Sequence, residues 1–164
     1  MTSMLRVLSA LALMAAGVAQ PARAQATTDA QPAKLTFQGD VALWTVAIKP
    51  DKTAAFEQIM TRVREALGKS SDPSRQRQAA GWKVMKIEKP LPDGNIAYVH
   101  VITPVARDVD YTVMQILYDA FPEERQALYE TYRDAFAANL SLATGPVAVD
   151  LTPGTAASAG AGAQ

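Results

Sequence analysis

Trp44, Tyr98 and His100 are the side chains of this sequence best suited to bind or transform a small molecule. Tyr98 and His100 are two residues apart in "NIAYVHVITP" (residues 95–104), a stretch without charge, so they share one face if it forms a strand. An imidazole among aromatic rings is suited to proton transfer, to metal ligation or to hydrogen bonding with a ligand. We therefore take these three as candidate ligand-binding residues and assign no catalytic residue.

Each of these side chains also has a purely structural interpretation. His100 is the only histidine of the chain, and in the middle of a strand it fits a neutral, half-buried ring that donates one hydrogen bond. Trp44 and Tyr98 fit packing in a core or an interface. The two interpretations differ in whether the face that carries these residues opens onto a cavity.

Other catalytic patterns are missing from the sequence. It has no glycine-rich phosphate loop, no cysteine and a single histidine, so neither a metal-ligand cluster nor a recognisable catalytic triad can be assembled. Asp108 and Asp110 flank Val109 just before a predicted helix, where a helix cap is favoured over a cation site. We expect no metal and no resident cofactor.

The first residues resemble a cleavable export signal. Arg6 precedes an apolar run over residues 7–19, which is too short to span a bilayer, and "ARA" at 22–24 provides the small residues of a cleavage site. We predict a signal peptide over 1–24, a flexible leader over 25–39 and a disordered Gly/Ala-rich tail over 152–164. The mature protein is expected in the periplasm or the medium, with no stable membrane anchor after cleavage.

The charge balance argues against several classes of partner, and the absence of cysteine excludes disulfides. The chain has 16 basic and 16 acidic residues, and removing Arg6 and Arg23 with the signal leaves 14 basic and 16 acidic residues, or about −2. This balance gives no reason to expect binding to nucleic acid or to an anionic membrane. Without cysteine, no disulfide stabilises the protein.

The first half of the predicted domain contains clear periodic segments. Residues 41–50 form a strand, and apolar residues at helical spacing predict a helix over 51–69 with Asp51 as its cap. Asp72 and Pro73 predict the start of a short helix within 70–81. Residues 82–89 form a second strand.

The second half begins with a hairpin. "PLPDGN" (90–95) predicts a turn, and residues 96–103 return as a third strand. Helical spacing predicts helices over 108–120 and 123–143, the latter ended by Gly145 and Pro146. A short final strand is expected over 147–151.

This β-α-β-β-α-β order predicts a ferredoxin-like α+β sandwich over residues 40–151, with sheet order 4-1-3-2 and helices on one face. The two central strands in that order are the two without charge, whereas strand 82–89 carries four charged residues, as edge strands often do. Because the central strands are apolar on both faces, the second face needs a cover. A second copy related by a two-fold axis provides one, so we expect a homodimer through the sheet.

"VAIKPDKTAAFEQIM" (residues 46–60) resembles the start of the dimeric α+β barrel superfamily, which includes antibiotic-biosynthesis monooxygenase-like and NIPSNAP-like proteins. The chain also resembles small exported bacterial proteins of uncharacterised role. Some superfamily members are cofactor-independent oxygenases, and others bind or degrade haem. The resemblance therefore implies a role for Trp44 and His100 in a cleft between sheet and helices, although the haem-degrading members take their histidine from a helix.

Three hypotheses follow for function. The favoured one is a non-catalytic exported dimer that binds a small apolar ligand or a protein partner. The alternative is a cofactor-independent monooxygenase or a haem-binding or haem-degrading enzyme. The third is a structural protein whose activity is self-association.

Overall fold

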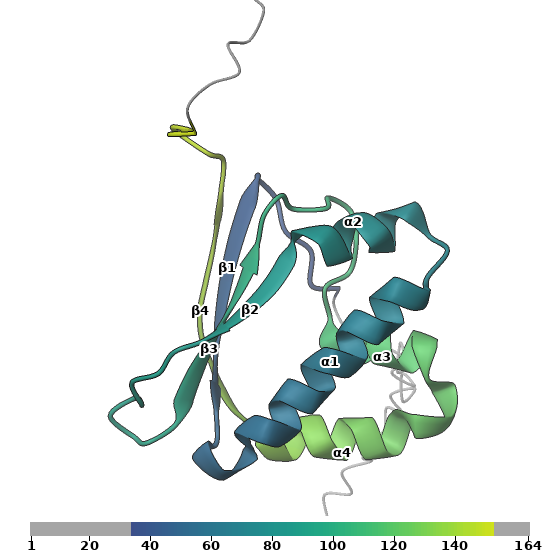
Figure 1. Ribbon diagram of the computed structural model, residues 1–164, viewed down its shortest axis with the longest axis vertical. Coiled ribbons are helices and arrows are strands. Elements are labelled where there is room, and N and C mark those ends of the chain that lie inside the picture. The colour runs from purple at the N-terminus through teal and green to yellow at the C-terminus, as the bar shows by residue number, and fades with distance from the viewer. Residues whose placement is uncertain (1–33, 153–164) are drawn as a thin grey trace, which may run out of the picture. The chain divides into compact units, whose positions relative to one another are not determined.

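A computed structural model describes residues 34–152 of the chain (Figure 1). The strands are β1 (Val41–Ile48), β2 (Trp82–Lys86), β3 (Ile96–Ile102) and β4 (Phe136–Gly145). The helices are α1 (Thr53–Lys69), α2 (Pro73–Gly81), α3 (Val113–Ala120) and α4 (Arg125–Ala135), with 3-10 turns at Pro50–Lys52 and Pro122–Glu124.

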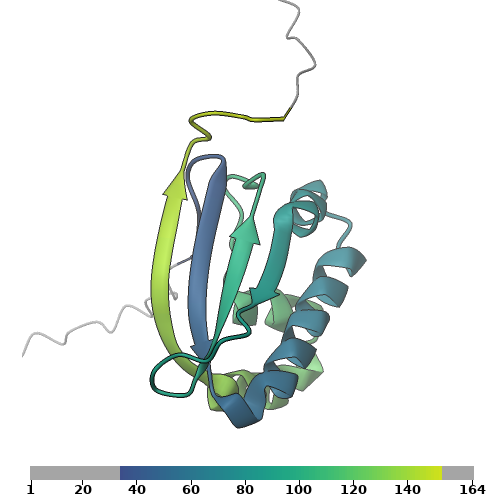
Figure 2. The ribbon, with the colours of Figure 1, turned by 60° about the vertical axis from the view of Figure 1, so that its left-hand side comes forward.

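The four strands form one antiparallel sheet in the order β2-β3-β1-β4. This is the predicted 4-1-3-2 order, and the ferredoxin-like α+β fold is confirmed. The helices lie on one face of the sheet, and no described helix covers the other face (Figures 1 and 2). We call the uncovered side the open face. His100 faces the helices, because its ring stacks on Trp44 and meets Phe56 of α1.

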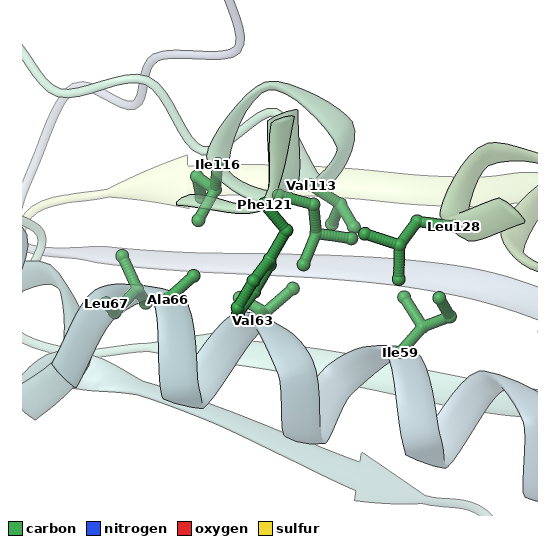
Figure 3. Close-up of a cluster of buried hydrophobic side chains, with 9 residues drawn as sticks. Ile59, Val63, Ala66, Leu67, Val113, Ile116, Phe121 and Leu128 are labelled. Atoms are coloured by element: carbon green, nitrogen blue, oxygen red, sulfur yellow. The ribbon is translucent and has the colours of Figure 1, made fainter. Parts of the chain in front are cut away.

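Helix α1 packs its apolar stripe against α3 and α4. Ile59, Val63 and Leu67 point into a cluster that also takes Val113 and Leu128 (Figure 3). Burying such a stripe supplies most of the stability of a helix of this length. Asp51 does not cap α1 as predicted: it lies in the 3-10 turn, and the N-cap position is Lys52, without a side-chain hydrogen bond. The turn after Pro50 moves the helix start past the carboxylate.

The predicted cap of α2 is confirmed, since the Asp72 carboxylate accepts a hydrogen bond from the Ser74 amide at 2.8 Å. The helix then runs into β2 without a loop. Gly81, its last residue, is buried so closely that a β-carbon would lie 2.3 Å from the Pro104 carbonyl oxygen. A side chain at this position would therefore force the helix away from the chain that follows β3.

The helix predicted over 123–143 is wrong in its second half. Helix α4 ends at Ala135, and Phe136–Gly145 forms the long edge strand β4 along β1. Residues 147–151, predicted as the final strand, have no regular structure. Phe136, Leu140 and Ala143 continue the helical spacing of α4, but pairing with β1 decides their conformation. The pairing is non-local, so the periodicity of the segment does not reveal it.

Two further boundaries differ from the prediction. The helix expected over 108–120 begins only at Val113: Asp108 has a positive φ of 62°, and residues 109–112 have no regular structure. The leader expected over 25–39 is partly packed: Phe37 is buried against Tyr111, with ring centroids 4.9 Å apart. The Tyr111 amide also donates to the carbonyl of Leu35. Residues 34–39 therefore form part of the domain.

The predicted signal peptide and nearly all of the predicted tail lie outside the described residues. Between residues 34 and 152, no helix has the length and apolar character needed to cross a membrane.

Candidate ligand-binding site

The structure brings Trp44 and His100 into direct contact. They are opposite each other on β1 and β3, and their rings stack with centroids 4.4 Å apart and an interplanar angle of 22°. Such aromatic cross-strand pairs stabilise a sheet beyond the area they bury. β1 and β3 are neighbours in the sheet, so the two rings meet, and they do so on the helix side.

His100 is held by a second tryptophan. The indole nitrogen Nε1 of Trp82 donates a hydrogen bond to Nδ1 of His100 at 3.1 Å. An indole N–H is only a donor, so Nδ1 must be the unprotonated nitrogen of the neutral ring and Nε2 must carry the proton. The ring accepts a hydrogen bond at Nδ1, where the sequence suggested a ring that donates one.

The imidazole is enclosed on all sides. His100 is fully buried rather than half-buried, and Phe56 meets it edge-on at 6.2 Å. Burial lowers the pKa of His100 to about 4, so the ring is neutral near pH 7. Its Nε2 is buried and, among the described residues, has no hydrogen-bond partner.

This arrangement limits the chemistry of His100. A general base or a metal ligand needs a free lone pair on an accessible nitrogen. Here the Nδ1 lone pair accepts from Trp82, and Nε2 carries the proton. His100 is therefore a packed, neutral side chain in this conformation.

Tyr98 lies on the same strand face but serves another contact. Its hydroxyl donates to Oε1 of Glu57 at 2.6 Å, and the Lys86 ammonium donates to the same oxygen at 3.0 Å. Burial and the Glu57 carboxylate both raise the pKa of the Tyr98 phenol. This cluster joins α1 to β2 and β3, so Tyr98 is not brought together with Trp44 around one site.

Trp44 is the candidate residue that reaches open space. It lines two pockets, of about 350 Å³ and about 270 Å³, which share Leu35, Trp44 and Asn139. We call these two pockets together the Trp44 groove. The remaining lining residues are Thr112, Val113, Met114, Tyr132, Phe136, Leu140, Ser141 and Leu142.

The groove has apolar walls and a few neutral polar groups. Asn139 on β4 accepts a hydrogen bond from the Trp44 indole at 3.0 Å, which fixes the indole as one wall. Burial raises the pKa of the Tyr132 phenol to about 12, so it stays protonated as a donor. None of the lining residues is charged. The groove is therefore suited to a small uncharged molecule with an apolar body.

A separate pocket of about 280 Å³ lies on the other side of the aromatic stack. Its lining includes Met60, Arg64, Trp82 and Val84. His100 lines neither this pocket nor the Trp44 groove. The two tryptophans thus separate the imidazole from both spaces.

No group of three or more His, Asp or Glu side chains within residues 34–152 is placed to hold a metal ion. Asp110 accepts hydrogen bonds from the amides of Thr112 at 2.8 Å and Leu35 at 3.1 Å. Its carboxylate thus ties the segment before β1 to the start of α3. The cap that we expected is in fact a local turn plus this long-range contact, since the N-cap of α3 is Thr112.

Sequence reasoning missed three residues of the site region. Asn139 and Tyr132 were placed on one helix, whereas they lie on β4 and α4 around the groove. Trp82 was not among the candidate residues. Its place at a helix-to-strand junction was visible in the sequence, but its bond to His100 depends on the register of β2 against β3.

Comparison with known proteins gives no match: no family model, no curated protein and no solved structure is significantly similar to this chain.

Proposed function

We propose that this protein binds a small, uncharged, apolar molecule in the Trp44 groove and performs no chemistry through His100. The observation that carries the proposal is the lining of the groove, which combines aromatic and aliphatic walls with neutral polar groups and no charge. Pockets of this composition bind by desolvation of an apolar body, and their few polar groups fix its orientation.

The lining residues of the groove narrow the class of ligand. Trp44, Tyr132 and Phe136 present aromatic surfaces, which favour a flat or aromatic body. The amide of Asn139 and the hydroxyl of Thr112 offer hydrogen bonds for one or two neutral polar substituents. A carboxylate or phosphate would enter without a cationic partner, at a high desolvation cost.

The oxygenase or haem hypothesis receives less support from this geometry. It required the face of Trp44 and His100 to open onto a cavity, and only Trp44 does so. His100 has neither access to the groove nor a free lone pair.

The test uses N-phenyl-1-naphthylamine, a neutral aromatic probe that becomes fluorescent in apolar sites. We expect the purified protein to bind it, and the Met114→Trp variant, which fills the groove's pocket of about 270 Å³, to bind at least about tenfold more weakly. The matched control is Thr61→Ala, which alters only the pocket under Trp82. If Thr61→Ala weakens binding of the probe and Met114→Trp does not, the probe does not bind in the groove and the proposed site is wrong. If only an anionic probe binds, the proposed ligand class is wrong.

We also propose that a second copy covers the open face. Leu43 and Met85 are exposed on that face, and Thr45, Val99 and Val101 are only partly buried. An apolar sheet face of this kind typically marks an interface. Sedimentation at micromolar concentration should therefore give a dimer, and Leu43→Asp should weaken that dimer at least about tenfold. A monomeric wild-type protein would exclude this association.

A further inference from the structure

The segment after β4 extends from the domain and is apolar except for Asp150. Val147, Val149 and Leu151 are 52 %, 72 % and 88 % exposed. They occur at alternate positions, the spacing that places side chains on one face of a strand. We call Val147–Leu151 the C-terminal arm. Figure 2 shows it continuing beyond the end of the sheet.

The start of the arm is held by hydrogen bonds and close packing. The Asp40 amide donates to the Gly145 carbonyl at 3.0 Å, and the Asp40 carboxylate accepts from the Val147 amide at 3.2 Å. Gly39 packs so closely that a β-carbon there would lie 2.7 Å from the Gly145 oxygen. These contacts direct the arm away from its own β4, and folding back onto that strand would break the bond between Val147 and Asp40.

Strand β4 also has a free edge. Among the described strands, β4 pairs only with β1, so its other edge presents unpaired backbone groups. Residues 136–145 include no charged residue and no proline, although natural edge strands usually carry such residues to prevent pairing. The other edge strand, β2, does carry Lys83 and Lys86.

Apolar side chains accompany that unprotected edge. Leu140 and Leu142 are both exposed on β4. The arm has five residues, which span about 17 Å when extended, so it can pair with half of the ten-residue β4, over residues 141–145. An apolar arm and an unprotected edge therefore follow one another in the sequence.

We propose that the C-terminal arm of one copy lies along the free edge of β4 in a second copy, and that the exchange is reciprocal. Because the arm directly follows β4, an antiparallel two-fold arrangement about the Gly145–Pro146 junction lets each arm reach the other copy's edge. The same contact pairs the backbone of the arm with the unpaired backbone groups of that edge. An unrelated partner would satisfy only one surface at a time, and a second copy satisfies both.

The absence of cysteine from the sequence allows a direct test. A chain carrying Val149→Cys on the arm is mixed with a differently sized tagged chain carrying Ala143→Cys on β4, under mild oxidation. We expect a disulfide between the two different chains. The matched control replaces the second chain by Lys83→Cys, which places the thiol on the opposite edge strand β2, and the cross-link yield should fall at least about fivefold, as for a contact that depends on position.

Three outcomes would overturn the inference. They are equal cross-linking to both edges, no cross-linking, and a bridge that forms only within a chain carrying both Val149→Cys and Ala143→Cys, which would mean that the arm folds back. A second variant, Val149→Asp with Leu151→Asp, leaves the folded core untouched and should weaken the dimer at least about tenfold. A dimer that persists in this variant without cross-links would place the association on the open face alone.

Discussion

The two sides of the Trp44 indole differ: one is packed in the core, and the other is open to a groove. One side stacks on His100 in a closed cluster with Phe56 and Trp82, and the other lines the open groove. Both environments consist of aromatic rings with a few neutral polar groups. They differ in enclosure: the closed side leaves no space beside the imidazole, and the groove exposes its polar groups to an incoming molecule. A cluster of aromatic residues therefore does not by itself define a site.

Truncating a side chain should cost more stability on the closed side of Trp44 than on the groove side. Phe56 is fully buried between His100 and Tyr98, so Phe56→Ala should lower the free energy of unfolding by about 3–5 kcal/mol. Leu142, on the groove side, is exposed, and Leu142→Ala should cost below about 1 kcal/mol. Urea unfolding of both variants measures the difference. Equal losses would mean that the groove is packed as tightly as the core.

The closed side should also make stability depend on pH. Burial lowers the pKa of His100 from its ordinary value of 6.5 to about 4. Between these values the unfolded chain binds a proton that the folded protein does not, so stability is complete above pH 6.5 and falls toward pH 4. The loss amounts to about 3 kcal/mol across the window.

Urea unfolding at pH 7.5 and at pH 4.5 checks this expectation. His100→Leu is the control, because it removes the only histidine and should abolish the loss in this range. The carboxylates of Glu57 and Asp110, whose pKa values are lowered, contribute mainly below pH 4.5 and do so in both proteins. A loss of equal size in the variant would show that His100 is not the group responsible.

The hydrogen bond between the two closed-side rings should appear in a double-mutant cycle. His100→Leu leaves the Trp82 N–H without its acceptor, at a cost of about 1–3 kcal/mol. When Trp82→Phe is already present, the same change should cost about 1 kcal/mol less, since no donor is left unpaired. Strict additivity in the unfolding free energies would show that the bond contributes nothing.

The smallest expected effect is on haem binding, where replacing His100 should change nothing. Because the Nδ1 lone pair is occupied and the ring is buried, titration with haemin should produce no shift of the Soret band attributable to His100. Absorbance spectra of wild type and His100→Ala should therefore coincide. A shifted band in the wild type that disappears in the variant would contradict the closed geometry and revive the haem hypothesis.

Much of the fold was predictable from the sequence. Strands β1 and β3 lack charge, helix α1 has a clear apolar stripe, and these patterns led to the correct sheet order. The error at β4 has a specific cause: "FAANLSLATG" continues the helical spacing of α4, and only pairing with β1 makes it a strand. The groove was not predictable for the same reason, since Asn139 reaches Trp44 only through that pairing.

For the candidate residues, residue type and strand face were predictable, whereas accessibility was not. Tyr98 and His100 lie on the expected common face, yet each is committed to an internal partner, Glu57 and Trp82 respectively. Those partners come from α1 and β2, which sequence spacing alone does not place. Trp44 differs only because helices α3 and α4 leave space beside it.

The direct junction between α2 and β2 gives the molecule a mechanical link. Gly81 packs against the Pro104 carbonyl and the next residue is Trp82, so no flexible connection separates the helix from the indole that holds His100. Trp82 is also the first residue of β2 and is paired with Ile102 of β3, so the end of α2, the sheet and the buried imidazole are joined through a single residue.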